Sequence, residues 1–469
     1  MRSVAKRFFS KKSESVDFVN GSIPRALIRY SFPILIGNIL QYLYSAVDAW
    51  VLGQSGQTEA YAAVGSLSSV TQTLVALFWG FSQGAGIVIA RAHGARDSDR
   101  VSRGAHTALV VTFFIGAFLT VVGMLLSPQL LRFVLGADGD PEIYRHAKTY
   151  LLIFFGGIIP MLIYNIGAEI MRSLGNSHYP FLFLCVGSVL NILLDLLFVF
   201  VFRLGIAGVA WATVLAQALA ALLVLAVLFS HRSPMRLSVR CLRIDRALMM
   251  TIIRLGIPVA IQHAIVNVSA MFTQSYIAGT DGNQTAVLGG YATFTRTLSI
   301  LCQPAAVVQG AVAVFVGQNL GAGNFARVRS GTRWGVILAT GTMLPLCLGV
   351  TFFSEYVPYI FTSDAAVVAH AAELFRYLTL FYLIEALCYP LVGAVRGLGL
   401  TAQLMALTMA THIAFRQVYL FVMANYISNS YLPIVFSIPA GMILFGLLAT
   451  VIYARSMRRF SRQYGMPSV

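Results

Sequence analysis

Polar side chains recur at helical spacing inside apolar stretches of the first half of the chain. Successive members of each group lie three or four residues apart, so each group occupies one face of a helix. The three groups are Asn38, Gln41, Ser45 and Asp48; Ser188, Asn191 and Asp195; and Thr213 and Gln217. Charged side chains are costly in apolar surroundings and are usually retained there for function, so Asp48 and Asp195 are the main candidates.

The oxygen atoms of these groups suit a hard cation or a proton. Two carboxylates, an amide and a hydroxyl supply the ligands that such a cation prefers. The same two carboxyl groups could hold one proton between them, because two nearby like charges in a low dielectric oppose joint ionisation. Hydrogen bonding between packed helices is the alternative. It stays open for the uncharged members, whereas for Asp48 and Asp195 we favour a functional role.

The second half of the chain has one acid deep in an apolar run. Glu385 lies in the segment FYLIEALCYP, and on an earlier run His263 and Asn267 share a face with Gln274. Coupling or substrate binding by Glu385, His263 and Asn267 stands beside a simpler alternative, which is polar packing near a cavity. Two arginines inside apolar runs also need partners, and Glu385 is a candidate partner for them. These arginines are Arg296 and Arg416.

The composition requires a membrane environment for these residues. The chain has 469 residues, of which 58% are apolar and 11% charged, with a mean hydropathy of +0.78. Soluble domains carry about 25% charged residues, and disordered chains combine low hydrophobicity with high charge. Both classes are excluded, and so is nucleic-acid binding, because the net charge of +16 is not gathered in a basic domain outside the apolar runs.

The apolar runs predict an all-α protein with twelve membrane-spanning helices. The runs are too long and too evenly apolar for the alternating strands of a membrane β-barrel. They cover residues 25–52, 60–90, 104–134, 144–171, 178–202, 206–230, 247–278, 286–318, 331–361, 367–395, 401–426 and 431–455. With these spans, 26 Lys and Arg residues fall on the side of the termini and five on the other. This bias predicts that both termini are cytoplasmic.

The two halves of the chain resemble each other. GARDSDRVSRG at residues 94–104 corresponds to GAGNFARVRSG at 321–331, and Pro33 corresponds to Pro258. Six spans separate the copies, so both have the same orientation and predict two six-helix bundles related by an axis along the membrane normal. Such a pair could rock between inward-open and outward-open shapes. At the same offsets Asp48 falls on Thr273 and Asp195 on Tyr419, so the acid pair is specific to the first copy.

Ordered motifs along nearly the whole chain give a resemblance to a known family. They include SFPILIGNILQYLYSAVDAWVLG, ARAHGARDSDRV, MRSLGNSHYP, GSVLNILLDLLFVF and GQNLGAGNFARV. The chain resembles the multidrug and toxic compound extrusion (MATE) family, most closely its DNA-damage-inducible (DinF-like) branch. The resemblance implies two six-helix lobes forming a V, and export of amphipathic compounds driven by inward H⁺ or Na⁺.

The resemblance also implies roles for particular residues. The cation or proton site of that branch corresponds to Asp48, Asn191, Asp195 and Thr213, which would be the metal ligands if the ion is Na⁺. A bending proline corresponds to Pro33. One asparagine of the family site is Ala168 in this chain, and Glu385 matches the acid of the Na⁺-coupled branch, so the sequence combines features of two branches.

The leading functional hypothesis is therefore a cation-coupled antiporter that exports organic compounds or drugs by alternating access. The alternative is a lipid-linked oligosaccharide flippase of the same superfamily. An enzyme is not expected, because the sequence has no HExxH or GxSxG motif and no paired aspartates on one span. We expect no cofactor beyond the coupling ion. The expected partners are an organic substrate and membrane lipid, with a monomer in the plasma membrane (the inner membrane of a bacterium).

The spans and the repeat also predict the domain organisation. The first half should form an N-terminal lobe at residues 25–231, and the second a C-terminal lobe at residues 247–455. Cytoplasmic segments should precede, join and follow the lobes, at residues 1–24, 232–246 and 456–469.

Overall fold

The computed structural model describes residues 15–54, 58–136, 140–230, 237–238, 243–280, 284–428 and 430–463, and the secondary structure within them is helical. The first half contains α2 (Ile23–Gln54), α3 (Thr58–Gly94), α4 (Ser98–Leu135), α5 (Pro141–Gly156), α6 (Ile158–Ser173), α7 (His178–Leu196), η1 (Leu197–Val201) and α8 (Ile206–Leu228). The second half contains α9 (Arg246–Ala278), α10 (Gln284–Leu301), α11 (Gln303–Gly321), α12 (Phe325–Phe352), η3 (Val357–Ile360), α13 (Ala365–Leu378), η4 (Thr379–Tyr382), α14 (Leu383–Gly397), α15 (Thr401–Thr408), η5 (Met409–Phe415), α16 (Arg416–Val422), η6 (Met423–Ile427), α17 (Tyr431–Val435) and α18 (Ser437–Gln463).

Each of the twelve predicted spans coincides with a helical run, so the prediction of an all-α membrane protein is confirmed. Within the described residues, nine helices are long and apolar enough to cross a membrane by themselves. Two more spans are bent pairs, α5 with α6 at 48° and α10 with α11 at 41°. The remaining run, α15 to η6, covers residues 401–427 with short α and π segments.

Local sequence explains the two bends. Pro304 stands in the first turn of α11, where its missing N–H cannot continue the hydrogen bonding of α10. The other bend lies at Gly157, between α5 and α6. A Cβ atom at Gly157 would collide with the side chain of Val214, so glycine also lets α8 approach this point closely. Small residues often permit such approaches between membrane helices, where lipid provides little hydrophobic drive for association.

The chain divides into two compact units. Unit 1 contains residues 1–17 and 32–256, and unit 2 contains residues 18–31 and 257–469. The division falls inside two long helices, because α2 passes from unit 2 to unit 1 after Ser31 and α9 passes from unit 1 to unit 2 after Gly256. These two points are 225 residues apart, the same offset that relates Pro33 to Pro258. Each unit therefore includes the first turns of the helix that opens the other half.

Each unit also forms hydrogen bonds with the chain segment that precedes these first turns, which are those of α9 in unit 1 and of α2 in unit 2. In unit 1 the backbone N–H of Ser238 donates to His106 Nε2 over 3.1 Å, and that of Asp245 donates to Thr107 Oγ1 over 3.0 Å. In unit 2 Arg327 donates to the Gly21 carbonyl over 2.6 Å. The first two contacts lie on α4 and the third on α12, which are equivalent helices of the repeat. The equivalent helices α4 and α12 thus have the same role, because each binds the segment that precedes the first helix of the other half.

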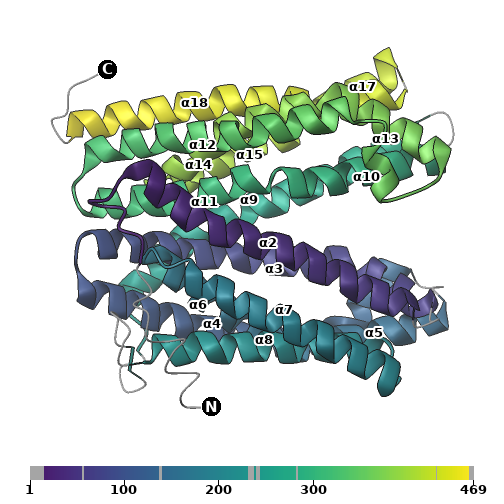
Figure 1. Ribbon diagram of the computed structural model, residues 1–469, viewed down its shortest axis with the longest axis horizontal. Helices are drawn as coiled ribbons and strands as arrows, with labels where there is room; N and C mark the ends of the chain where they lie inside the picture. The colour runs from purple at the N-terminus through teal and green to yellow at the C-terminus, as the bar shows by residue number, and fades with distance from the viewer. Residues whose placement is uncertain are drawn as a thin grey trace. The chain divides into compact units, whose positions relative to one another are not determined.

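Helix packing within each unit can be followed in Figure 1. In unit 1, α6 lies against α3, α4 and α8, and in unit 2, α14 lies against α11, α12 and α18. The repeat is visible in the turns that follow α6 and α14. Gly175 and Gly399 both have positive φ, at 84° and 77°, and both backbone N–H groups donate to the arginine carbonyl three residues earlier. Glycine adopts this left-handed conformation without steric cost.

Candidate functional site

The carboxyl groups of Asp48 and Asp195 lie close enough in unit 1 for a hydrogen bond to join them. Asp48 is on α2, and Asp195 is near the end of α7, where its side chain is fully buried. Asp48 Oδ1 and both oxygens of Asp195 receive no hydrogen bond from an amide, hydroxyl or basic group of the described chain. A shared proton or a bound cation would satisfy these oxygens, because two carboxylates without donors repel each other.

Asn191 and Thr213 extend this pair. Asn191 precedes Asp195 by one helical turn on α7, and its Nδ2 donates to Thr213 Oγ1 on α8 over 3.5 Å. The Thr213 hydroxyl donates in turn to the Val209 carbonyl over 3.1 Å. These two hydrogen bonds orient the amide of Asn191. Its Oδ1 is buried, accepts no hydrogen bond in the described structure, and remains available as a ligand. The structure therefore brings together the four residues that the sequence placed at a cation site.

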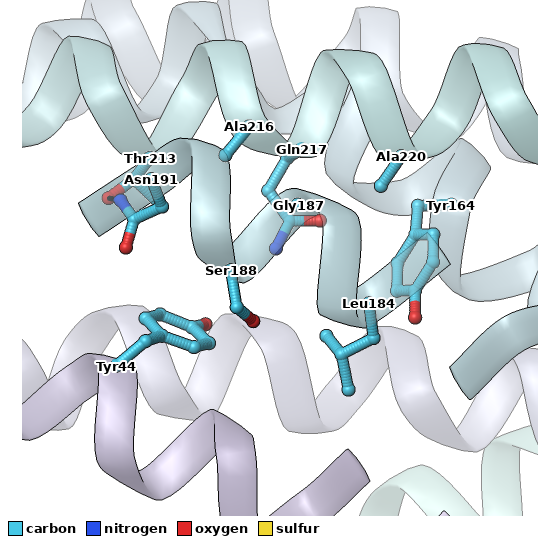
Figure 2. Close-up of a pocket in the computed structure, with 10 residues that line it drawn as sticks. All are labelled: Tyr44, Tyr164, Leu184, Gly187, Ser188, Asn191, Thr213, Ala216, Gln217 and Ala220. Atoms are coloured by element: carbon cyan, nitrogen blue, oxygen red, sulfur yellow. Dashed lines mark hydrogen bonds between the residues drawn. The ribbon is translucent and has the colours of Figure 1, made fainter. Parts of the chain in front are cut away.

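A narrow cavity of about 300 Å³ lies beside these residues in unit 1 (Figure 2). Asn191 and Thr213 line one end of it, and Tyr164 and Leu184 line the other. Gln217 and Ser188 also line it, so both predicted polar faces of α7 and α8 point into this space. Neither Asp48 nor Asp195 lines the cavity, and Asn191, one turn before Asp195, is the lining residue that connects it with the carboxyl pair.

The ligand oxygens of this site suit a proton or Na⁺ better than a transition metal. The available ligands are carboxylate, amide and hydroxyl oxygens, which suit hard cations. Within the described residues no group of three His, Cys, Asp or Glu side chains could hold a metal. Ala168 on α6 is fully buried and supplies no oxygen, where the family resemblance expects an asparagine. The side-chain oxygens of Asp48, Asn191, Asp195 and Thr213 come from α2, α7 and α8.

The other polar residues predicted on α2 lie away from the cavity. Gln41 and Ser45 are exposed, and the Ser45 hydroxyl donates to the Gln41 carbonyl over 2.9 Å. Asn38 is half-buried and does not line the cavity either. Tyr44 lines it instead, and sequence reasoning missed this residue. The signal was present, because Tyr44 precedes Asp48 by four residues and shares its face.

Unit 2 contains a larger cavity, of about 780 Å³. Glu385 and His263 line it, as the sequence suggested for a second polar site, whereas Asn267 is exposed and lies outside the lining. The Glu385 carboxylate accepts hydrogen bonds from the Tyr389 hydroxyl and the Cys302 thiol. Sequence reasoning missed several polar lining residues, among them Gln262 and Arg396, and the predicted spans left Arg396 between residues 395 and 401.

Arg416, for which Glu385 was a candidate partner, has a different hydrogen-bond partner. Its Nη1 donates to Ser269 Oγ over 3.2 Å, and the Ser269 hydroxyl donates to the His412 carbonyl over 2.7 Å. Arg416 is buried, so this contact satisfies part of a guanidinium that would otherwise be costly in the interior of the unit.

Pro33 lies inside α2, two residues after the point where this helix changes units. The helix continues through it, although proline removes one backbone donor from the hydrogen-bonding ladder. The equivalent Pro258 lies two residues after the change of units in α9.

Two repeats of helices around buried polar sites are typical of a membrane transporter, and the comparisons with known proteins give the family. The model of the MatE family matches residues 33–197 and 258–421, which together exceed half of the chain. The protein belongs to this family, the multidrug and toxic compound extrusion transporters. It is an integral membrane protein and a transporter, not an enzyme. The match begins at Pro33 in the first half and at Pro258 in the second.

Curated relatives span most of the chain. A probable multidrug resistance protein of Bacillus subtilis, YpnP, is 27% identical over 403 residues, which are 86% of this chain and 89% of that protein. A second one, YoeA, is 29% identical over 351 residues, or 73% of this chain and 74% of that protein. An FAD transporter of Shewanella oneidensis is 25% identical over 384 residues, or 80% of this chain and 81% of that protein.

Solved structures support the fold. An outward-facing multidrug resistance MATE transporter of the MOP superfamily is 22% identical, with a TM-score of 0.89 over 95% of this chain and 98% of that chain. A MATE protein in its bent conformation is 21% identical, with a TM-score of 0.89 over 97% of this chain and 99% of that chain. At this level of identity the likeness shows the shared fold alone.

Proposed function

We propose that this protein exports amphipathic organic compounds in exchange for H⁺ or Na⁺ bound between Asp48 and Asp195. The observation that carries the proposal is the pair of adjacent carboxyl groups, in which Asp48 Oδ1 and both oxygens of Asp195 lack hydrogen-bond donors in the described chain. The names of the Bacillus subtilis relatives, probable multidrug resistance proteins, support organic compounds as cargo. They favour export of such compounds over the flippase alternative.

Coupling follows from the electrostatics of the pair. With a proton or Na⁺ bound, the two carboxyl groups can stay close together, because the cation offsets their repulsion. Once the cation leaves, the repulsion favours a conformation in which the two carboxylates are farther apart or are hydrated. An ion can shift such an equilibrium only through its different affinities for the two states, and the burial of Asp195 provides that difference.

The neighbouring groups have supporting roles in this mechanism. The narrow cavity would bring an ion as far as Asn191, one helical turn from Asp195, and the Asn191 amide oxygen is a further ligand there. Pro33 allows α2 to bend near the point where its residues change from unit 2 to unit 1. Ion binding at Asp48 can therefore change the position of a helix that has residues in both units. This proposal includes alternating access, a plasma-membrane location with cytoplasmic termini, and a monomer surrounded by lipid.

The proposal is tested with purified protein in sealed vesicles loaded with a fluorescent organic cation. A Na⁺ gradient and a pH gradient are imposed separately and at matched membrane potential. We expect one of the two gradients to drive movement of the dye against its own concentration. Dye movement that follows only its own gradient under both conditions would exclude coupled export.

A further inference from the structure

The last helix of unit 2 has one exposed face that changes from apolar to basic along its length. Figure 1 shows α18 along one edge of unit 2, and it packs on α14 and α15. Ile443, Leu447 and Val451 are spaced four residues apart on this face and are 43%, 63% and 42% exposed. The same spacing continues to Arg455 and Arg459, which are also exposed. The change from apolar to basic therefore falls between Val451 and Arg455.

Four arginines make up the basic end of this face, and all four are exposed. They are Arg455, Arg458, Arg459 and Arg462, whose spacing of three and four residues keeps them together on the helix. Neither α18 nor α15 contains an Asp or Glu, and the single acid of α14 is in its first turn. The basic end of α18 is thus a concentrated positive charge without an acid on its own helix.

The opposite face of α18 fixes the direction of these arginines. Ala449 packs with Val392 of α14 and Leu404 of α15 in the core of unit 2. Further along the helix Ser456 and Met457 are buried as well. Because these residues face inward, the arginines point away from unit 2, as the exposed apolar residues before them do. The whole face therefore lies on the lipid side of the helix.

Repulsion among the four arginines calls for an anion from outside the chain. Like charges three or four residues apart destabilise a helix. The partial negative charge of a helix C-terminus offsets this only in the last turn, which contains Arg462. The repeat does not require such a cluster either, because α8, the equivalent helix of the first half, contains no Lys or Arg.

We infer that this face of α18 binds an anionic phospholipid, with its phosphate at the four arginines and its acyl chains along Ile443, Leu447 and Val451. The inference goes beyond the proposed export and does not depend on it. A guanidinium binds phosphate oxygens through paired hydrogen bonds, and basic clusters at the end of a membrane helix attract anionic lipids.

The dimensions of the face suit a lipid better than a soluble anion. At a rise of 1.5 Å per residue, Leu447 and Arg455 are about 12 Å apart along the axis. A headgroup at the arginines therefore leaves the acyl chains beside the apolar part of the same face. A soluble anion would use the basic end alone.

Two lipids with the same acyl chains test the inference. Dioleoyl-phosphatidylglycerol carries one net negative charge, whereas dioleoyl-phosphatidylcholine is zwitterionic. Each is titrated into the purified full-length protein in detergent, without substrate or ion gradient, and bound lipid is counted by native mass spectrometry. We expect phosphatidylglycerol to bind at least about tenfold more tightly. Equal affinity for the two lipids would overturn the inference.

Variants with matched charge identify the site. Arg458→Gln/Arg462→Gln should lower the affinity for phosphatidylglycerol by about tenfold and change phosphatidylcholine binding little. The control Arg96→Gln/Arg100→Gln removes the same charge from an exposed turn of unit 1, where Asp97 stands between the two arginines. It should leave the preference unchanged. An equal loss in both variants would show that net charge determines binding, and would overturn the assignment to α18.

A second pair of arginines covers the case in which the first variant does not fold. Arg455→Gln/Arg459→Gln should cause a similar loss, and an unchanged preference in either folded variant would overturn the inference. The native protein also distinguishes a lipid from a soluble anion. Glycerophosphoglycerol, the headgroup without acyl chains, should not displace phosphatidylglycerol at equal concentration. Displacement as effective as that by the lipid itself would reject a lipid as the occupant.

Discussion

Asp48 and Asp195 are 147 residues apart in the sequence, yet their carboxyl groups lie within hydrogen-bonding reach inside unit 1. They come from α2 and α7, and the equivalent positions of the second half hold Thr273 and Tyr419. The pair is therefore not a packing element that the repeat requires. It is a specialised feature of one unit, as expected for an ion site.

The first prediction concerns the removal of either charge. Asp48→Asn and Asp195→Asn should each reduce dye efflux against a gradient by about tenfold or more. The reason is that the ion would then bind the two conformations of the protein with similar affinity. The double variant should be little worse than either single variant, since the two groups act as a unit. Efflux from vesicles under an imposed gradient measures all three, and additive losses would show that the aspartates act separately.

Thermal unfolding gives the control for these variants. Neutralising one of two adjacent carboxylates removes repulsion and leaves the shape of the side chain almost unchanged. The unfolding temperature of each variant should therefore equal or exceed that of the native protein. A large fall would mean that transport is lost through misfolding, and that the pair has a structural role.

The second prediction concerns Pro33. Pro33→Ala restores a backbone donor to α2 next to the point where this helix changes units, which should stiffen it. We expect a folded protein with normal dye binding and a transport rate lowered several-fold, on the basis that a bend in this helix is part of the cycle. Single-turnover efflux separates the two steps, and an unchanged rate would remove this bend from the mechanism.

The third prediction separates the two units by function. Glu385→Gln should leave the ratio of ions to substrate close to the native value, because Glu385 belongs to unit 2 and the coupling pair to unit 1. Its effect should appear in the range of compounds transported, and the transport of compounds with a cationic group should fall most. Stoichiometry is measured from paired ion and dye fluxes. A greater loss of coupling in Glu385→Gln than in Asp48→Asn would move the ion site to unit 2.

The fourth prediction concerns orientation, which follows from 26 basic residues on one side against five on the other. Ser330 on α12 and Ser363 before α13 are both exposed and lie near opposite ends of one span. In a cysteine-free background, Ser363→Cys should react with an impermeant thiol reagent added outside intact cells. Ser330→Cys should react only after lysis. Labelling of both from the same side is incompatible with twelve spans.

Much of the fold could be predicted because membrane helices depend on local sequence. Every backbone polar group must be satisfied within the span, so a long apolar run fixes a helix almost by itself. Spacing within a run also predicts the polar faces, and Asp48, Asn191, Asp195 and Thr213 meet as expected. Tyr44 follows the same spacing but was overlooked, since a tyrosine in an apolar run is as often part of the packing.

The rest depends on tertiary packing that no local pattern encodes. The first turns of α2 and α9 belong to the unit of the other half, a pairing between segments more than 200 residues apart. Arg396 follows an apolar run and looks like a loop residue. Only the position of Gln262 on α9, 134 residues away, shows that its guanidinium lines a cavity. The partner of Arg416 was likewise hidden, because Ser269 carries no charge to suggest it.

Reverse coupling tests the central claim most directly, because it measures the ion itself. Vesicles are prepared with a steep gradient of dye and no gradient of H⁺ or Na⁺, and ion flux is followed with a pH-sensitive probe and with radioactive Na⁺. We predict that dye movement drives one of these ions in the opposite direction in the native protein. In the double variant Asp48→Asn/Asp195→Asn the dye should still equilibrate without ion movement. Undiminished ion counter-flux in that variant would contradict the assignment of the coupling site to Asp48 and Asp195.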